Sequence, residues 1–295
     1  MFWPNNARIA VTISLMFEAG SQDLRKALGP FPVAQEGDSP DLPTNSWFDY
    51  AANEGIPRAL DLFDRHGVKA SSFMTGMSVE RYPHIAREIV KRGHEAAAHG
   101  RSWAPSFNMA RDVEKNFIAD GMASVERITG QRPVGWNAHA MRNSVNTLEI
   151  LQELDFIYFI DDLSRDEPFI IPLPQGEIGV VPYTAHLNDL HNLLHVYDLA
   201  QLELLLKEEF DQLYEEGARR RRMMVVSLHD RVGTRPASIR VFDRVLDHMG
   251  RKKDVWFARK HDIAQWALTN REHTPIVARG PAGETGLPGP ATAFG

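Results

Sequence analysis

Short apolar runs alternate along the chain with longer segments whose apolar residues recur every three or four positions. The short runs are rich in β-branched residues and have the length of strands, whereas the longer segments have the spacing of amphipathic helices. The candidate strands are Arg8–Phe17, Val68–Thr75, His94–His99, Val134–Asn137, Phe156–Ile160, Gly179–Pro182, Met223–His229 and Val255–Ala258. The candidate helices are Ile56–His66, Val79–Arg92, Val113–Thr129, Thr147–Leu154, Leu199–Glu216, Ala237–Gly250 and Asp262–Leu268. This alternation predicts an α/β fold with about seven or eight parallel strands.

Four glycines support the predicted helix ends. Gly67, Gly93, Gly130 and Gly217 each fall just after a candidate helix, where a residue in the left-handed conformation commonly closes the last turn. No change in composition divides the chain, and no repeat of solenoid length occurs in it. We therefore predict one catalytic domain over residues 1–270.

Two segments lack the pattern of a helix or a strand. Residues 20–45 are rich in proline and glycine, and a loop of this length in a compact domain usually serves a function or stays disordered. We predict that it folds over the functional site as a lid. The second segment is the Gly/Pro-rich tail, residues 271–295, whose few glycine triplets are too short a repeat for a collagen-like triple helix.

Net charge and composition exclude several classes of partner and site. The 295 residues carry a formal net charge of -6, so the overall field repels a phosphate backbone and nucleic acid is not an expected partner. The chain has no cysteine, which excludes disulfides, thiolate nucleophiles and cysteine-bound zinc. It shows neither a secretory leader nor an apolar run of about 18 residues, so we expect a cytoplasmic protein that does not enter the membrane.

The candidate strands end on polar and titratable side chains. In a β/α barrel the catalytic groups stand at the C-terminal ends of the strands, because helices and the packed interior fill the remaining volume. The residues at these ends are Phe17-Glu18, His99-Gly100, Trp136-Asn137, Asp161-Asp162, Tyr183 and His229-Asp230. We predict that the functional site is built from them.

Three of these residues suit acid–base chemistry. Glu18 emerges from an apolar strand, where desolvation is expected to raise its pKa and suit it to general-base work. The alternative is a structural carboxylate that pairs with an arginine at the rim of the barrel. His229 closes another apolar run, and its imidazole is a natural proton donor to a leaving nitrogen. His99 follows small residues that leave room for a pocket, although a core histidine bonded to the backbone fits the pattern equally well.

Motifs in a fixed order resemble the polysaccharide deacetylase family. Leu15–Gly20 is similar to the first motif of that family and Gly93–Gly100 to the second. Arg132–Trp136 resembles the approach to the third motif, Ser227–His229 the last, and the opening Trp3-Pro4-Asn5 also resembles family members. Each motif is weak alone, but the ordered set is fairly specific. The resemblance implies a distorted (β/α)7 barrel that hydrolyses an amide bond.

Two positions depart from the metal-dependent members of that family. Those members carry a base aspartate followed by an aspartate ligand, and two ligand histidines four residues apart. Here Glu18 takes the base position, and Ala19 or Gly20 stands where the ligand would be. Trp103 stands four residues after His99. Since catalytic zinc normally has three protein ligands, we expect no metal and no other cofactor.

Further departures point to one branch of the superfamily. Asn137 replaces the family's third-motif arginine, which orients the base, and a metal would have to recruit His139 or Asp162. The run His99–Trp103, together with the glutamate at the base position, is most similar to metal-independent allantoinases, which open a cyclic ureide; related members hydrolyse cyclic imides. Segments that resemble the substrate side of that branch are Asp161-Asp162-Leu163, Pro182-Tyr183-Thr184 and Asn188-Asp189.

Metal-free hydrolysis of an amide needs a base, donors to the developing oxyanion and an acid. Glu18 is the predicted base, His229 the predicted acid, and His99 the third catalytic residue. The candidate substrate-binding residues are Trp103, Asn137, His139, Arg142, Asp162, Tyr183, Asn188 and Asp189. Arg142, Asn137 and His99 are the candidate donors to the carbonyl oxygen. A small strained cyclic substrate demands less of such a site than an acetamide does.

Two other functions stay open at this point. One is a metal-dependent deacetylase of N-acetylated sugars with an unusual ligand set. The other is a barrel that binds a small molecule without turning it over, since a fold does not guarantee activity. Retention of Glu18 and His229 argues against the second.

We also predict self-association. The resemblance implies a homotetramer, because the small-substrate branches of the superfamily tend to form one. Aromatic and proline residues at Phe31-Pro32, Trp47-Phe48 and Phe294 lie in irregular segments, where a second subunit could bury them.

Overall fold

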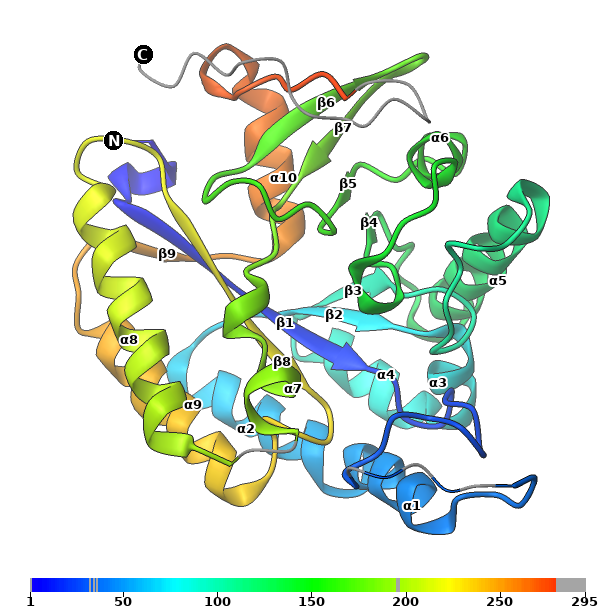
Figure 1. Cartoon of the computed structure of the whole chain (residues 1–295). Helices are drawn as coiled ribbons and strands as arrows, with labels where there is room; N and C mark the ends of the chain where they lie inside the picture. Colours follow the sequence, from blue (N-terminus) through cyan, green and yellow to red (C-terminus); the bar gives the residue numbers. More distant parts are fainter. Residues whose placement is uncertain (1, 32, 34, 36, 195–196, 280–295) are drawn as a thin grey trace.

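The computed structural model describes residues 2–31, 33, 35, 37–194 and 197–279. Within them a curved sheet carries nine strands in the order β6-β7-β5-β4-β3-β2-β1-β8, with β9 beside the start of β1 (Figure 1). The strands are β1 Ile9–Phe17, β2 Ser71–Met74, β3 Glu95–Ala98, β4 Gly135–Trp136, β5 Tyr158–Phe159, β6 Phe169–Leu173, β7 Gly176–Val180, β8 Met223–His229 and β9 Val255–Phe257.

Helices pack around the outside of this sheet (Figure 1). The α-helices are α1 Leu42–Tyr50, α2 Ile56–His66, α3 Gly76–Arg81, α4 Pro83–Lys91, α5 Arg111–Thr129, α6 Thr147–Glu153, α7 Asp189–Leu193, α8 Leu199–Glu216, α9 Pro236–Gly250 and α10 Lys260–Thr269. Shorter turns are η1 Pro4–Asn6, η2 Ala51–Gly55, η3 His139–Met141, η4 Ala185–Leu187 and η5 Arg271–His273. None of the described helices is both long and apolar enough to cross a membrane.

The strands run parallel except for β6 and β7, which form an antiparallel hairpin. β6 and β8 lie at the two ends of the sheet order, and no pairing joins them in the part of the chain that the structure describes. The barrel is therefore open rather than closed. The predicted α/β fold, a distorted barrel of β/α units, is confirmed.

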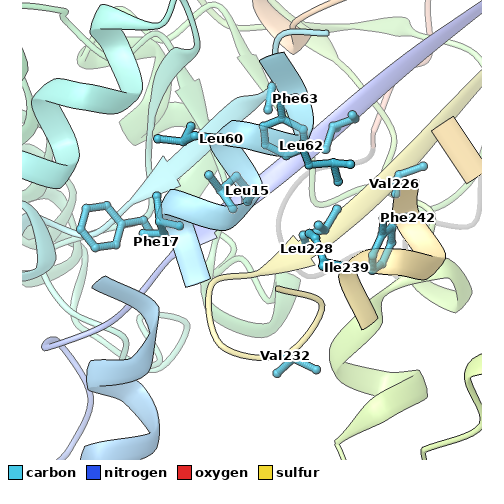
Figure 2. Packing of buried hydrophobic residues seen from close by; sticks show 14 of the residues in the cluster. Leu15, Phe17, Leu60, Leu62, Phe63, Val226, Leu228, Val232, Ile239 and Phe242 are labelled. Atoms are coloured by element: carbon cyan, nitrogen blue, oxygen red, sulfur yellow. The ribbon is translucent and has the colours of Figure 1, made fainter. Parts of the chain in front are cut away.

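β1 lies inside the sheet and is buried along its whole length. Its side chains alternate between two faces, as in any strand. The outward face packs against helices: Figure 2 shows Leu15 of β1 beside residues of α2, and Leu228 of β8 beside Ile239 and Phe242 of α9. Full burial of each such side chain contributes about 1.5–3 kcal/mol. This packing holds the C-terminal ends of β1 and β8 side by side.

Most predicted helices occur with nearly the predicted bounds, and α2 and α8 have them without change. The predicted helix Val79–Arg92 is wrong as a single element, because it is split between α3 and α4. Pro83 causes the break. It lacks an amide hydrogen and disfavours helical geometry at the preceding residue, and Tyr82 accordingly has φ -126° and ψ 61°.

Three further expectations need correction. The irregular segment was expected to reach residue 45, but α1 begins at Leu42, where the Asp41 carboxylate accepts a hydrogen bond from the amide of Thr44. β6 lies in a stretch with no predicted strand. Gly217 has φ -58° instead of a left-handed value; its lack of a Cβ serves close packing against the Arg8 carbonyl oxygen.

Residues 275–277 pair with the outer edge of β6. The amide of Ile170 donates to the carbonyl oxygen of Pro275 at 2.9 Å, and the amide of Val277 donates to the carbonyl oxygen of Ile170 at 2.8 Å. The first part of the predicted tail thus packs on the barrel, while residues 280–295 lie outside the described residues. The domain boundary at residue 270 stays a prediction.

Candidate active site

A cavity of about 920 Å³ opens at the C-terminal ends of the strands. Glu18 follows β1, His99 follows β3, Asn137 follows β4, Tyr183 follows β7, and His229 ends β8. All five side chains line the cavity, as the strand-end argument predicted. Parallel strands end at one edge of a sheet, so residues far apart in sequence meet there.

The Glu18 carboxylate is the centre of this cluster and is only 1% exposed. Its Oε1 lies 3.4 Å from Nε2 of His99 and 3.7 Å from Nε2 of His229. Its Oε2 lies 2.7 Å from a guanidinium nitrogen of Arg231. One oxygen is therefore tied in an ion pair, and the other faces both imidazoles.

Asp230 joins the ends of β1 and β8. One of its oxygens accepts hydrogen bonds from the backbone amides of Glu18 at 2.8 Å and Ala19 at 3.0 Å. The other accepts from the guanidinium of Arg231 at 2.7 Å. These contacts fix the backbone that carries the Glu18 carboxylate.

The charge state of Glu18 differs from the sequence-based expectation. Burial favours the neutral carboxyl and would raise its pKa, but the charges of Arg231 and His229 and the contact with His99 outweigh burial. The pKa of Glu18 is held well below its usual value. The expected rise was wrong because the carboxylate pairs with an arginine, Arg231, as the alternative for Glu18 had it.

His229 is oriented by Asp189. Its Nδ1 hydrogen-bonds to one Asp189 oxygen at 2.7 Å. The other Asp189 oxygen accepts from the backbone amides of His229 at 2.7 Å and Gly233 at 2.6 Å. Burial would lower the pKa of His229, but the charges of Asp189 and Glu18 raise it above its usual value. The imidazolium form thus persists to higher pH and presents its Nε2 proton toward Glu18 and the cavity.

His99 is held by the strand next to its own. Its Nδ1 lies 2.7 Å from the carbonyl oxygen of Asn137, which can only accept, so Nδ1 carries the proton. The Asn137 amide donates to Asp161 at 2.5 Å, and the backbone amide of Ala138 donates to the same carboxylate at 2.9 Å. Burial raises the pKa of Asp161 to about 7, against these two hydrogen bonds. His99 is thus buried and bonded to the backbone, as one of the two expectations had it, and it also lines the cavity.

Solved structures and sequence relatives share this architecture. Residues 40–159 match the polysaccharide deacetylase family. A structure described as a probable polysaccharide deacetylase from Pseudomonas aeruginosa PAO1 is 30% identical, with a TM-score of 0.84 over 92% of this chain and 94% of that one. The chain belongs to the polysaccharide deacetylase superfamily. The predicted family and hydrolase class are confirmed.

Other members of the superfamily match the chain over most of its length. The crystal structure of PuuE allantoinase has a TM-score of 0.85 and is 28% identical, over 92% of this chain and 94% of that one. A protein named peptidoglycan deacetylase from Helicobacter pylori is 24% identical, over 83% of this chain and 90% of its own length. Similar relatives therefore carry the names of two different activities.

The superfamily resemblance implies a divalent metal beside the base, but the residues here do not fit one. Ala19 follows Glu18 and offers no donor atom, and the Trp103 ring packs against Phe48 with ring centroids 5.5 Å apart. The second oxygen of Glu18 is already paired with Arg231. Over residues 2–31, 33, 35, 37–194 and 197–279, no three His, Asp or Glu side chains are arranged to hold a metal ion.

The predicted substrate-binding residues fall into two groups in this deacetylase-superfamily site. The group that lines the cavity comprises Trp103, Asn137, His139, Arg142, Tyr183 and Asn188. His139 and Arg142 flank a turn in which Ala140 and Met141 have φ of 52° and 58°, a strained backbone that is common at functional sites.

Asp162 and Asp189 do not line the cavity, which corrects two of the predicted positions. Asp162 pairs with Arg279 and hydrogen-bonds to Ser164 at the outside of the barrel. Asp189 is fully buried and bonded to Nδ1 of His229, so it orients that imidazole. Sequence reasoning missed Arg231 although it directly follows His229-Asp230, because no pattern indicates where a side chain beyond a strand end will point.

The long irregular segment also contributes to the site. Asp23, Lys26, Ala27 and Leu28 line one side of the cavity. Ser21 ties the segment to the loop after β3, because its carbonyl oxygen accepts from the Trp103 amide at 3.1 Å. The segment thus forms a wall of the site, and its motion as a lid stays a prediction.

Proposed function

We propose that this chain hydrolyses a carbon–nitrogen bond of a small cyclic amide, imide or ureide with protein groups alone. One observation carries the proposal: the ionised Glu18 carboxylate meets the imidazoles of His99 and His229 at 3.4 Å and 3.7 Å. The positions that would complete a metal site hold Ala19 and Trp103. The likeness to PuuE allantoinase over 92% of this chain supports this interpretation.

In the proposed reaction Glu18 acts as the base, Arg142 as the oxyanion donor and His229 as the acid. Water attacks the ring carbonyl while Oε1 of Glu18 accepts its proton, and the oxyanion is stabilised by Arg142. The ring C–N bond then breaks as Nε2 of the His229 imidazolium gives its proton to the leaving nitrogen. Transfer of the proton from Glu18 to neutral His229, whose atoms lie 3.7 Å apart, restores both groups. The product is an open-chain acid with a free amide, urea or amine nitrogen.

The cavity walls favour a small molecule with an apolar part. Ala27, Leu28, Leu163, Leu190 and Leu194 line the cavity away from the polar floor. Its volume of about 920 Å³ is at the upper end of the range for small-molecule pockets, and it exceeds the needs of an unsubstituted five-membered ring. We therefore propose that the ring carries an apolar substituent that contacts these side chains.

A second candidate is the hydrolysis of N-acetyl groups on a sugar polymer with a metal. The names of the Pseudomonas aeruginosa and Helicobacter pylori relatives favour it. The donor set around Glu18 disfavours it, because deacetylation of a relaxed acetamide makes more use of a Lewis acid than ring opening does.

A substrate panel with and without a chelator tests the proposal. Allantoin, succinimide, hydantoin, a 5-alkyl hydantoin and an N-acetylglucosamine oligomer would be compared, with Glu18→Gln as the inactive control. We expect ring opening that survives the chelator, and faster turnover of the substituted hydantoin than of hydantoin. Release of acetate that the chelator abolishes would support the second candidate and overturn the first. No turnover of any ring would also overturn it.

A further inference from the structure

Arg231 is a buried cation directly behind the base. Its side chain has 0% exposure and does not line the cavity. One guanidinium nitrogen lies 2.7 Å from both Oε2 of Glu18 and Oδ1 of Asp230. A buried charge is costly unless it is paired, so this contact fixes all three side chains together.

Aromatic rings enclose the rest of the guanidinium. Its central carbon lies 3.9 Å from the ring centre of Phe48, 4.8 Å from that of Trp47 and 5.2 Å from that of Trp103. We call these three rings the cage. Ring faces attract a desolvated cation, and in the described residues Nε and Nη2 of Arg231 have no hydrogen-bond partner. The remaining polar contacts of the cation are thus concentrated on Glu18 and Asp230.

We propose that Arg231, held by the cage, is a positioning residue. It holds Oε2 of Glu18 in an ion pair, so that Oε1 is the oxygen that accepts the proton from water. The assignment rests on the proposed function, in which Glu18 is the base. Trp103 belongs both to the cage and to the cavity wall, so it couples the substrate surface to the base. Trp103, which occupies the position of the second histidine ligand in metal-dependent members, thus packs against the guanidinium of Arg231.

The charged groups that face Glu18 set the expected pH response. They are Arg231 and Asp230 after β8, His229 at the end of β8, His99 after β3, His139 after β4 and Tyr183 after β7. Arg231 is the permanent positive charge in contact with the carboxylate. Its removal leaves burial and Asp230 to favour the neutral carboxyl, so the acidic limb of kcat/KM should move to higher pH.

Arg231→Lys and Arg231→Met test this assignment, with Arg221→Met as the matched control. Arg221 is also buried and lies 5.4 Å and 5.9 Å from the ring centres of Trp266 and Trp3, but it pairs with Glu167 at the other end of the barrel. We expect kcat to fall about 100-fold or more in Arg231→Met, with the acidic limb moved upward because the charge is lost. In Arg231→Lys we expect kcat to fall roughly tenfold, with a smaller shift of the acidic limb because lysine keeps the charge but not the geometry of the guanidinium. Arg221→Met should lose stability without either change.

A stability cycle on the same pair needs no substrate, so it separates this assignment from the proposed function. Thermal unfolding would be measured for the wild type, Glu18→Gln, Arg231→Met and the double variant. Arg231→Met leaves the buried Glu18 carboxylate without its counter-ion. The double variant lacks that carboxylate, so its melting temperature should be higher than that of Arg231→Met. If Arg231→Met does not fold, Arg231→Lys replaces it in the cycle. Additive melting shifts would overturn the coupling, and a folded Arg231 variant with unchanged kcat and acidic limb would overturn its role in catalysis.

Discussion

His229 owes its proton affinity to a residue 40 positions earlier in the chain. Asp189 holds Nδ1 of His229 and raises its pKa, with help from Glu18 and against burial. An acid with a raised pKa stays protonated to higher pH, so the basic limb of kcat/KM should lie above the ordinary histidine range. Glu18 has a lowered pKa, so the acidic limb should lie below the ordinary glutamate range.

Asp189→Asn should move the basic limb to lower pH, because the substitution removes the charge that stabilises the imidazolium. We expect kcat to fall by about 10–100-fold at neutral pH. Asp211→Asn is the matched control, since Asp211 bonds His248 at 3.0 Å on the outer helices far from the cavity. An unchanged basic limb in Asp189→Asn would move the acid to another residue.

Glu18→Gln should lower kcat by about 10²–10⁴-fold, the usual contribution of a positioned base. The amide keeps the shape of the side chain, and Arg231 keeps its pairing with Asp230, so the protein should still fold and bind substrate. Steady-state kinetics and a binding isotherm with the same ring substrate check both parts. More than about a tenth of wild-type kcat would exclude Glu18 as the base.

The sequence alone does not determine which of two neighbouring side chains faces the site. Glu18, His99 and His229 could be placed at one site because parallel strands end at a common edge. Asp161 and Asp162 follow the same strand, but successive side chains leave a strand on opposite sides, so Asp161 faces the site and Asp162 faces Arg279. A sequence without a known register does not decide between such neighbours.

Among the helices, η2 and α2 press against the loop that carries Asp230. A Cβ added to Gly55 would stand 1.9 Å from the carbonyl oxygen of Asp230 and 2.7 Å from Oγ1 of Thr234. Only glycine allows this approach. The periodicity predicted the bounds of α2 without change, but the close contact at its start depends on tertiary packing that periodicity does not contain.

Gly55→Ala should therefore destabilise the protein by about 1–3 kcal/mol, as overpacking typically does, and should lower kcat by displacing the Asp230–Arg231 pair. A melting temperature lower by roughly 2–4 °C per kcal/mol would accompany it. Gly250→Ala is the control, because among the described residues no neighbouring atom lies within 4 Å of the place that the added methyl group would take at the end of α9. Equal melting temperatures for the two variants would contradict the packing argument.

For the molecule as a whole, two of the aromatic residues that were expected to contact a second subunit are buried within the protomer. Trp47 is 8% exposed and Phe48 is 0% exposed, so both are buried in their own barrel and give no support to an oligomer. Phe31 is 54% exposed, so a second subunit could still bury it. Pro32 and Phe294 lie outside the described residues.

Exposed apolar side chains occur in the segment before α1 and at the first residue of that helix, where Leu24, Leu28, Val33 and Leu42 are each 49–78% exposed. A second subunit that covers this segment would also cover one wall of the cavity. We expect an oligomer, with a homotetramer as the predicted size. Light scattering at micromolar concentration checks it, and a mass near the 33.3 kDa protomer would refute it.

The short pairing of residues 275–277 with β6 has a practical consequence for handling the protein. An uncovered strand edge offers free amides and carbonyls to any extended chain nearby and is a common start of aggregation. A chain trimmed at residue 270 would lose the backbone partners of Ile170 and the contact between Arg279 and Asp162. Such a truncation would turn a protected rim into a surface on which copies of the protein can stack.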